Sequence, residues 1–493
     1  MDDLLPKLLA FPPHPPPQTP LSDFQYDEGI RNQISTVGKI PEKNLLPQTS
    51  GGENALDVIN PAINTVPYIY ILLAHINAAQ KGNKGVNWDT LWAKIANFLE
   101  TFDGRQIRYL GKEFTQIIET AVTLARSNNQ SILAIGPIRT ALLRLDPSGS
   151  ILTSTHLHLV ELALEARDYE TVLPVIDKFI YHFPGATNQP RPKFLCELGL
   201  SPTAYITPES KLTAKLNHQD VLEYFMYSGM VYIGLRKWES ALECLENAIT
   251  YPAKDVSKIM VEAYKKWILV GLLLEGKPLN LPKSTSSSVA KSYHVVAKPY
   301  ETVAQIFETG TASRLKAEVE AGQKIWQGDC NMGLMLSVLS AYQKFQIRNL
   351  ADIYSKISIP EVNNLTMSAE TGGKLQSPAL AEQLVQSMIS EGSLNATLSH
   401  PPNGPAILTF GLGAPIMTED QMQKELQASK QRIQFLTQEI KTTDRLLTYD
   451  KEYVKYMQKL KKNAKNGVTD QGISGPDMDW NPIEDEDIMA GVF

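Results

Sequence analysis

Between residues 54 and 275, apolar side chains recur at spacings of three and four residues, and this period constrains the fold more than any other feature of the sequence. Leu91, Ile95, Phe98 and Leu99 form one such group. The spacing places apolar side chains on one face of an α-helix, whereas a half-buried strand needs strict alternation. No alternating run of useful length interrupts the segment. The chain is therefore predicted to be mainly α-helical.

Two parts of this helical segment read as copies of one helix pair. The second copy has the spacing of a tetratricopeptide repeat, with Phe225, Gly229, Tyr232, Ala241, Leu245 and Ala248 followed by Pro252. The first copy, 69 residues earlier, aligns Tyr169, Val172 and Ile176 with Trp238, Ala241 and Leu245, and His156 with Phe225. We predict a repeat solenoid over residues 54–281, which would offer a long surface to partners. A plain helical bundle with chance spacing is the alternative.

Three polar or proline-rich segments separate or flank the helical parts. Residues 1–53 contain the run FPPHPPPQTP, which predicts a flexible arm because so much proline prevents a helix. Residues 282–292, PKSTSSSVAKS, predict a linker. Residues 463–493 hold seven acidic residues and one lysine, which predicts a disordered acidic tail.

After a further helical block from about residue 299 to 357, the pattern changes to that of a winged helix over about 348–413. Ser377 and Pro378 are suited to start a helix, which stops at Gly392. Two short alternating runs follow, at 393–399 and 406–410, with the turn signal Asn403-Gly404 between them. Short helices followed by a hairpin are typical of a winged helix.

A long final helix is predicted over residues 417–462. An apolar residue recurs every seven positions, and the alternate seam position is apolar in part; the stripe comprises Leu426, Ile433, Leu436, Ile440, Leu447, Val454 and Met457. A sustained heptad stripe requires a partner helix. The stripe is therefore a candidate partner-binding surface.

The sequence contains no motif that predicts catalysis, a metal or a cofactor. Phosphate-binding glycine loops, HExxH and GxSxG are absent, and the three cysteines include no CxxC pair. His156-Leu157-His158 is the one tempting metal pattern. A zinc protease with the pattern HxH-x7-SxxD would need serine and aspartate where this chain has Ala166 and Tyr169. We predict no catalytic, cofactor-binding or metal-binding residues.

Charge and hydropathy argue against nucleic acid and membrane as partners. The formal net charge is -6, and no lysine or arginine lies between Lys374 and the end of the hairpin. A DNA-reading helix without a cation would be repelled by phosphates. The apolar stretch 66–79 is too short to span a bilayer, and the N-terminus lacks the pattern of a signal peptide. Cytoplasm and nucleus are the expected locations.

Three runs in order near the C-terminus resemble elements of the PCI-domain family. Residues 328–334, GDCNMGL, match D-x-N-x-x-L, and residues 347–362 match L-x-x-x-Y-x-x-I-x-(I/L)-x-x-(I/V). Residues 388–396, MISEGSLNA, match M-I-x-x-G-x-(I/L)-x-A. The family occurs in the proteasome lid, the COP9 signalosome and translation initiation factor three. The resemblance implies a PCI domain over residues 293–413, a helical part followed by the winged helix.

Within the family, residues 216–252 and 298–345 look most like the signalosome branch, while an insert at Glu370–Ser377 departs from the usual pattern. The resemblance implies a non-catalytic scaffold in a complex that removes a ubiquitin-like modifier from cullins of cullin–RING ligases. Other PCI and protease subunits would be its partners, and the ligases indirect ones. The hairpin edge, with Leu394 and Asn395, and the last helix would make the contacts.

Two alternatives remain open: a paralogous scaffold subunit of the proteasome lid, and a free-standing peptide-binding repeat protein. The long heptad helix argues against the second, because an unpartnered chain would leave its apolar stripe exposed.

Overall fold

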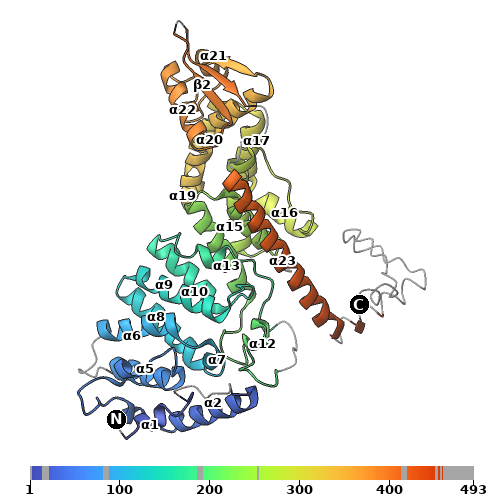
Figure 1. The fold of residues 1–493 in the computed structure, drawn as a ribbon. Helices are drawn as coiled ribbons and strands as arrows, with labels where there is room; N and C mark the ends of the chain where they lie inside the picture. Colours follow the sequence, from blue (N-terminus) through green and yellow to red (C-terminus); the bar gives the residue numbers. More distant parts are fainter. Residues whose placement is uncertain are drawn as a thin grey trace. The chain divides into compact units, whose positions relative to one another are not determined.

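The structure is a computed structural model that describes residues 3–13, 21–81, 88–185, 192–252, 255–402, 404–411 and 419–449, with Val454, Lys455 and Gln458. The chain divides into two units, Met1–Phe410 and Gly411–Phe493. Helices dominate the described residues, as predicted, and those of the first unit follow one another in chain order (Figure 1).

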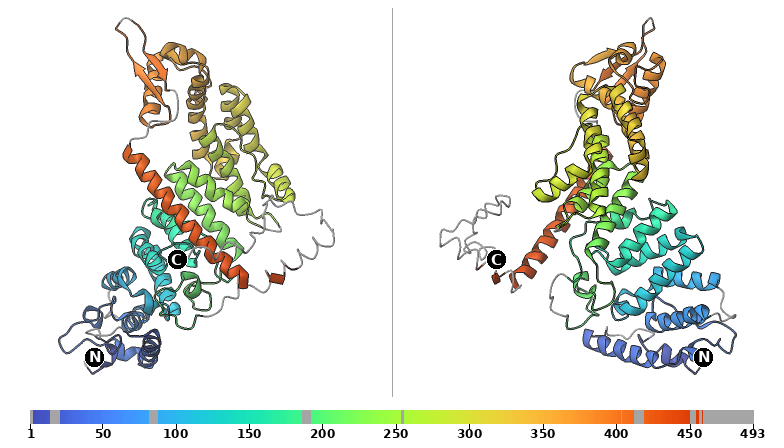
Figure 2. Two further views of the ribbon diagram at one scale, coloured as in Figure 1. Left: turned by 45° about the vertical axis from the view of Figure 1, so that its right-hand side comes forward. Right: turned by 180° about the vertical axis from the view of Figure 1, so that it is seen from behind.

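The predicted flexible arm is wrong for the described part of residues 1–53, which is helical and packed. Its helices are α1 (Leu5–Leu8), α2 (Asp23–Gly38) and α3 (Glu42–Leu45). A capping box between Ser22 and Gln25 starts α2, and Tyr26, Ile30 and Val37 are buried. Helix α2 lies against α5 in Figures 1 and 2. Residues 14–20 of the proline run lie outside the described residues.

Helix pairs build the predicted repeat region. The elements are α4 (Ala55–Val58), α5 (Thr65–Gln80), α6 (Trp88–Thr101), α7 (Gly104–Ile107), α8 (Gly111–Ser127), α9 (Ser131–Leu145), α10 (Ser154–Ala166), α11 (Leu173–Ile176), α12 (Pro202–Tyr205), α13 (His218–Gly234), α14 (Trp238–Ile249) and α15 (Lys258–Glu275). The tetratricopeptide spacing identifies the pair α13–α14 correctly. A Cβ atom added at Gly229 would lie 3.1 Å from Leu245, so glycine permits this close approach.

The first predicted copy is only partly a helix pair. Helix α10 forms, but its partner α11 is a single turn, with Val172 and Ile176 buried. Residues 177–217 hold only the short helix α12 in their described part, so the region is not helical throughout as predicted. Pro174 lies in the first turn of α11, where proline is tolerated, whereas the following sequence contains Pro184, Gly185, Pro190 and Pro192, which oppose a further long helix.

The predicted linker 282–292 is half wrong, because its second part begins a helix. Ser286 accepts a hydrogen bond from the backbone of Val289 and caps α16 (Ser287–Val296). The following helices are α17 (Lys298–Thr309), α18 (Ala312–Ala321), α19 (Gln323–Gly328) and α20 (Met332–Asn349). A serine-rich run thus supplies a helix cap, where composition alone predicts a loop.

A small domain with its own core follows. Its elements are the 3-10 turn η1 (Leu350–Asp352), β1 (Lys356–Ser358), α21 (Ile359–Leu365), α22 (Pro378–Ser390), β2 (Ala396–Ser399) and β3 (Ile407–Phe410). The antiparallel sheet has the order β1-β3-β2. Val362, Val385 and Leu408 are among its buried residues. The predicted hairpin is present, but Lys356–Ser358 is a strand and not the end of a helix; Asn403 of the predicted turn is not described.

In the second unit, α23 (Glu419–Tyr449) forms the described part of the predicted final helix. Val454, Lys455 and Gln458 are also helical. The start at 417–418, most of 450–462 and the tail 463–493 lie outside the described residues.

Candidate partner-binding surfaces

The predicted stripe on α23 is exposed within its unit. Leu426, Ile433 and Ile440 have exposed fractions of 65%, 64% and 62%. Leu436 is half-buried. Three large apolar side chains at seven-residue spacing therefore have most of their surface in water. None of them contributes the favourable free energy that burial of an apolar side chain gives.

The rest of the stripe is less completely described. Val454 is helical and 38% exposed. Leu447 lies on α23, although its side chain is not described, and Met457 lies outside the described residues. The stripe stays a prediction as a binding surface.

The alternate seam positions of α23 are partly polar. Ser429 and Thr443 occupy positions equivalent to Met422 and Leu436, and both are exposed. In a self-paired coiled coil, such polar residues would meet their own copies in the seam, at a cost in stability. The narrow stripe therefore fits a helix that joins a bundle of different helices better than one that pairs with itself.

The hairpin edge of the small domain is the second predicted surface. Strand β2 pairs only with β3 and so forms one edge of the sheet. Asn395 is exposed, but it precedes β2 and is not part of the strand. Leu394 is buried in the core of the domain, so its side chain is not available to a partner, contrary to the prediction. The alternating sequence predicts the hairpin, but not which side faces the core.

The polar side of α22 carries no lysine or arginine. The imidazole Nε2 of His400, beside the hairpin, lies 2.7 Å from a carboxylate oxygen of Glu382 on α22. A carboxylate at that position is unfavourable for a helix that would face phosphates.

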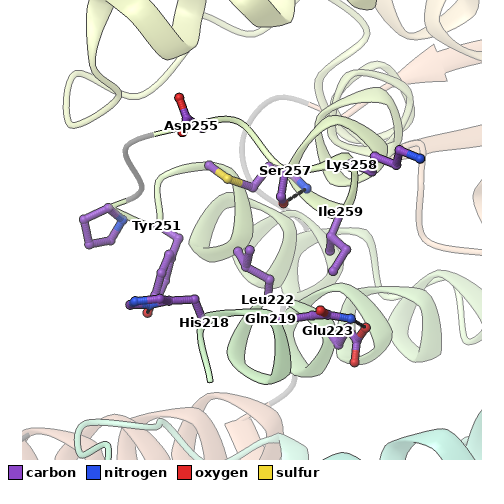
Figure 3. Close-up of a pocket in the computed structure, with 11 residues that line it drawn as sticks. His218, Gln219, Leu222, Glu223, Tyr251, Asp255, Ser257, Lys258 and Ile259 are labelled. Atoms are coloured by element: carbon purple, nitrogen blue, oxygen red, sulfur yellow. Dashed lines mark hydrogen bonds between the residues drawn. The ribbon is translucent and has the colours of Figure 1, made fainter. Parts of the chain in front are cut away.

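A groove in the repeat region has no counterpart among the sequence predictions. It holds about 920 Å³ and lies where α13 and α15 begin and α14 ends (Figure 3). Its lining comprises His218, Gln219, Leu222, Glu223, Tyr251, Pro252, Asp255, Ser257, Lys258, Ile259 and Met260. His218 and Tyr251 lie together on one wall, with the imidazole Nδ1 2.7 Å from the hydroxyl oxygen. Repeat spacing predicts the helices but not the hollow between their ends.

A buried polar cluster joins α15, α17 and the start of α20. The Tyr300 hydroxyl donates to Asp329 at 2.7 Å and accepts from the side-chain amide of Asn331 at 2.9 Å. Lys265 forms an ion pair with Asp329 at 2.9 Å. Burial raises the pKa of Tyr300, which keeps its hydroxyl a donor. The run GDCNMGL thus has a structural role, in which it holds three helices together.

The two histidines of the rejected metal pattern have separate surroundings. His156 is buried, and its Nδ1 accepts a hydrogen bond from the backbone N–H of Thr153 at 3.2 Å, which caps α10. Burial lowers the pKa of His156 to about 4. His158 lies 3.5 Å from Glu161 instead. Among the described residues, no three His, Cys, Asp or Glu side chains are grouped so that they could hold a metal ion.

None of the described helices is both long and apolar enough to cross a membrane.

Comparisons with known proteins point to one family. Residues 33–289 match the family model described as "COP9 signalosome complex subunit 3, N-terminal helical repeats". The protein named COP9 signalosome complex subunit 3 of Neurospora crassa is 35% identical over 505 residues, covering 100% of this chain and 99% of the relative. The protein of the same name from Emericella nidulans is 34% identical over 502 residues, covering 99% of each.

Proposed function

The chain belongs to the COP9 signalosome subunit 3 family, and from this premise we propose that it is a non-catalytic scaffold subunit of a COP9 signalosome. In that complex it would support the removal of the ubiquitin-like modifier from cullins. Its direct partners would be other PCI and protease subunits, with cullin–RING ligases reached through them. The cytoplasm and nucleus would be its locations.

The exposed heptad stripe of α23 is the observation that carries the scaffold role. A fully buried Leu or Ile side chain contributes about 1.5–3 kcal/mol. Leu426, Ile433 and Ile440 would gain most of that contribution only by entering a helical bundle with other subunits. The partly polar seam favours a bundle of different chains over self-association.

The edge of the three-stranded sheet supplies a second contact. An edge strand has backbone groups on one side that its own sheet does not use, and proteins usually pair or protect them. Strand β2 is short and lies at such an edge. A neighbouring subunit that added a strand there would extend the sheet.

Two other functions are less well supported. A role in the proteasome lid would use the same kinds of surface, but the matched relatives are named for the signalosome. A free-standing peptide-binding repeat protein could use the groove at His218 and Tyr251. That reading leaves the stripe on α23 without a purpose.

Co-elution with signalosome subunits tests the proposal. We expect Ile433→Asp with Ile440→Asp to abolish co-elution on size exclusion, because each carboxylate would have to be desolvated in the seam. Gln431→Asp with Gln438→Asp adds the same charge at the same spacing on the opposite face, and should co-elute normally. Full co-elution of the stripe variant would show that α23 is not the anchor.

A further inference from the structure

The insert that departs from the family pattern lies in a loop that reaches across two hydrophobic cores. Residues 366–377, the strap, connect α21 to α22 within the small domain. Ala369, in the strap, is fully buried in the core of the repeat and helical region. Leu375, further along, packs against the core of the small domain. One loop therefore has side chains in both cores.

Polar contacts hold the first half of the strap against α20. The buried side chain of Gln343 donates to the Thr366 hydroxyl at 3.2 Å, and the backbone N–H of Met367 donates to the side chain of Gln346 at 2.8 Å. Thr366 and Gln343 are both nearly inaccessible to water. Loss of such a buried bond leaves an unsatisfied polar group in the interior, which is unfavourable.

The middle of the strap is a tight turn seated on α18. The backbone N–H of Ser368 donates to the carbonyl oxygen of Gly373 at 2.8 Å, and that of Gly372 donates to Ser368 at 2.9 Å. Gly372 has a φ of +78°, and an added Cβ would lie 3.3 Å from the Cδ of Lys316 on α18. Lys316 also donates to the Thr371 carbonyl oxygen at 3.3 Å.

Apart from the strap, the two cores are joined by helix α20, which runs from one into the other, and by a partly exposed ion pair of 3.0 Å between Lys344 on α20 and Glu391 at the end of α22. The first part of α20 carries Val338 and Tyr342 of one core, and its last turn carries Ile347 of the other. A domain that is attached through one helix alone can bend and rotate about that helix. A second attachment away from the helix axis restricts this hinge motion.

We propose that the strap locks the small domain onto the helical layers, so that its sheet edge meets a neighbouring subunit at one fixed angle. The locking follows from the contacts of the strap, whereas its use in assembly rests on the proposed scaffold function. Disruption of the contacts of the strap should therefore make the orientation of the small domain variable while the core of that domain stays folded.

Spin-label distances on the isolated chain test the lock. Labels at Ala317→Cys on α18 and Gln386→Cys on α22 occupy exposed positions, in a chain with Cys244→Ser and Cys330→Ser; the remaining Cys196 is buried. We expect Ala369→Lys to broaden the distance distribution about twofold or more, since one packed arrangement is replaced by hinge motion. Gln376→Lys adds the same charge at an exposed position of the strap and should leave the width unchanged. Equal widths in both variants would overturn the proposal.

A milder pair keeps the test decisive where Ala369→Lys unfolds the helical core around residue 369. Gly372→Ala strains a left-handed turn beside Lys316, while Gly373→Ala has no atom within 4 Å of the new Cβ. Broadening in the first alone supports the lock, and no broadening in either refutes it. Co-elution of Ala369→Lys with partner subunits then tests the use of the fixed angle. Unchanged co-elution with a broadened distance refutes that use and leaves the lock in place.

Discussion

The ammonium group of Lys266 donates a hydrogen bond to the side-chain oxygen of Asn331 at 2.8 Å, and both side chains are buried. The Asn331 amide nitrogen donates in turn to Tyr300, so one side chain connects α15 with α17. Burial lowers the pKa of Lys266, as expected for an ammonium group removed from water. The cluster therefore holds a buried charge that is stabilised by the hydrogen bond to Asn331 and by the Glu262 carboxylate 4.0 Å away.

Asn331→Leu should destabilise the chain by about 1.5–3 kcal/mol, because a hydrogen bond to a charged group is lost and Lys266 keeps its buried charge. Urea unfolding followed by circular dichroism measures the change. Adding Lys266→Met removes the stranded charge, and we expect the double variant to regain part of the loss. A single variant as stable as the parent would mean that water replaces Asn331 at no cost.

Gly229→Val should destabilise the repeat region by about 1–3 kcal/mol, since its side chain would have to displace Leu245 or separate α13 from α14. Gly136 is the matched control, because it also lies in a helix but has no atom within 4 Å of an added Cβ. Gly136→Ala should stabilise by about 0.4–1 kcal/mol. Thermal unfolding distinguishes the two signs, and a neutral Gly229→Val would remove the packing argument for the repeat.

Sequence periodicity is sufficient to predict a helix or a strand where one face of that element packs against one core. It identified α13 and α14, the final helix and the hairpin, because each repeats its pattern over several turns or residues. It failed for β1, whose three residues are too few for a period and are fixed by pairing Ile357 with Leu408. Tertiary pairing, not local preference, decides such a strand.

Composition gives a wrong prediction where a few helix-capping residues decide the local structure. The proline run suggested an arm, although Ser22 and Gln25 cap a helix directly after it. The serine run suggested a linker, although Ser286 caps α16. Of the candidate partner-binding residues, the stripe on α23 could be predicted because it needs only spacing. The burial of Leu394 could not, because it depends on which way the hairpin folds over α22.

Acid should weaken the repeat region through His156. Its pKa is about 4 when folded, against an ordinary value of 6.5, because the imidazole is buried. Below pH 6.5 the unfolded chain binds a proton that the folded chain does not, so stability falls as the pH falls from 6.5 to 4, by roughly 3 kcal/mol in total. His75, whose pKa is also lowered by burial, adds to the same trend.

His156→Gln tests this assignment, because glutamine at this position can still accept the capping hydrogen bond from Thr153 but does not titrate. Urea midpoints measured from pH 7 to pH 4 should fall less steeply in the variant. The same variant combined with His158→Gln should leave the modifier-removing activity of the assembled complex intact. Loss of that activity with assembly preserved would mean that the pair has a catalytic role after all.

Proline substitutions in β2 test the sheet edge. Successive residues of an edge strand point their N–H groups alternately toward the neighbouring strand and away from it. Of Thr397→Pro and Leu398→Pro, one therefore removes a bond to β3, while the other removes only an outward donor. We expect the outward variant to keep the fold of the small domain, as judged by amide protection of β3, and to weaken co-elution with a neighbouring subunit about tenfold or more, which corresponds to about 1.4 kcal/mol. The inward variant should lose protection of β3 and so serves as the control for damage to the sheet. An outward variant that keeps both its fold and full co-elution would show that partners reach this chain through α23 without adding a strand to β2.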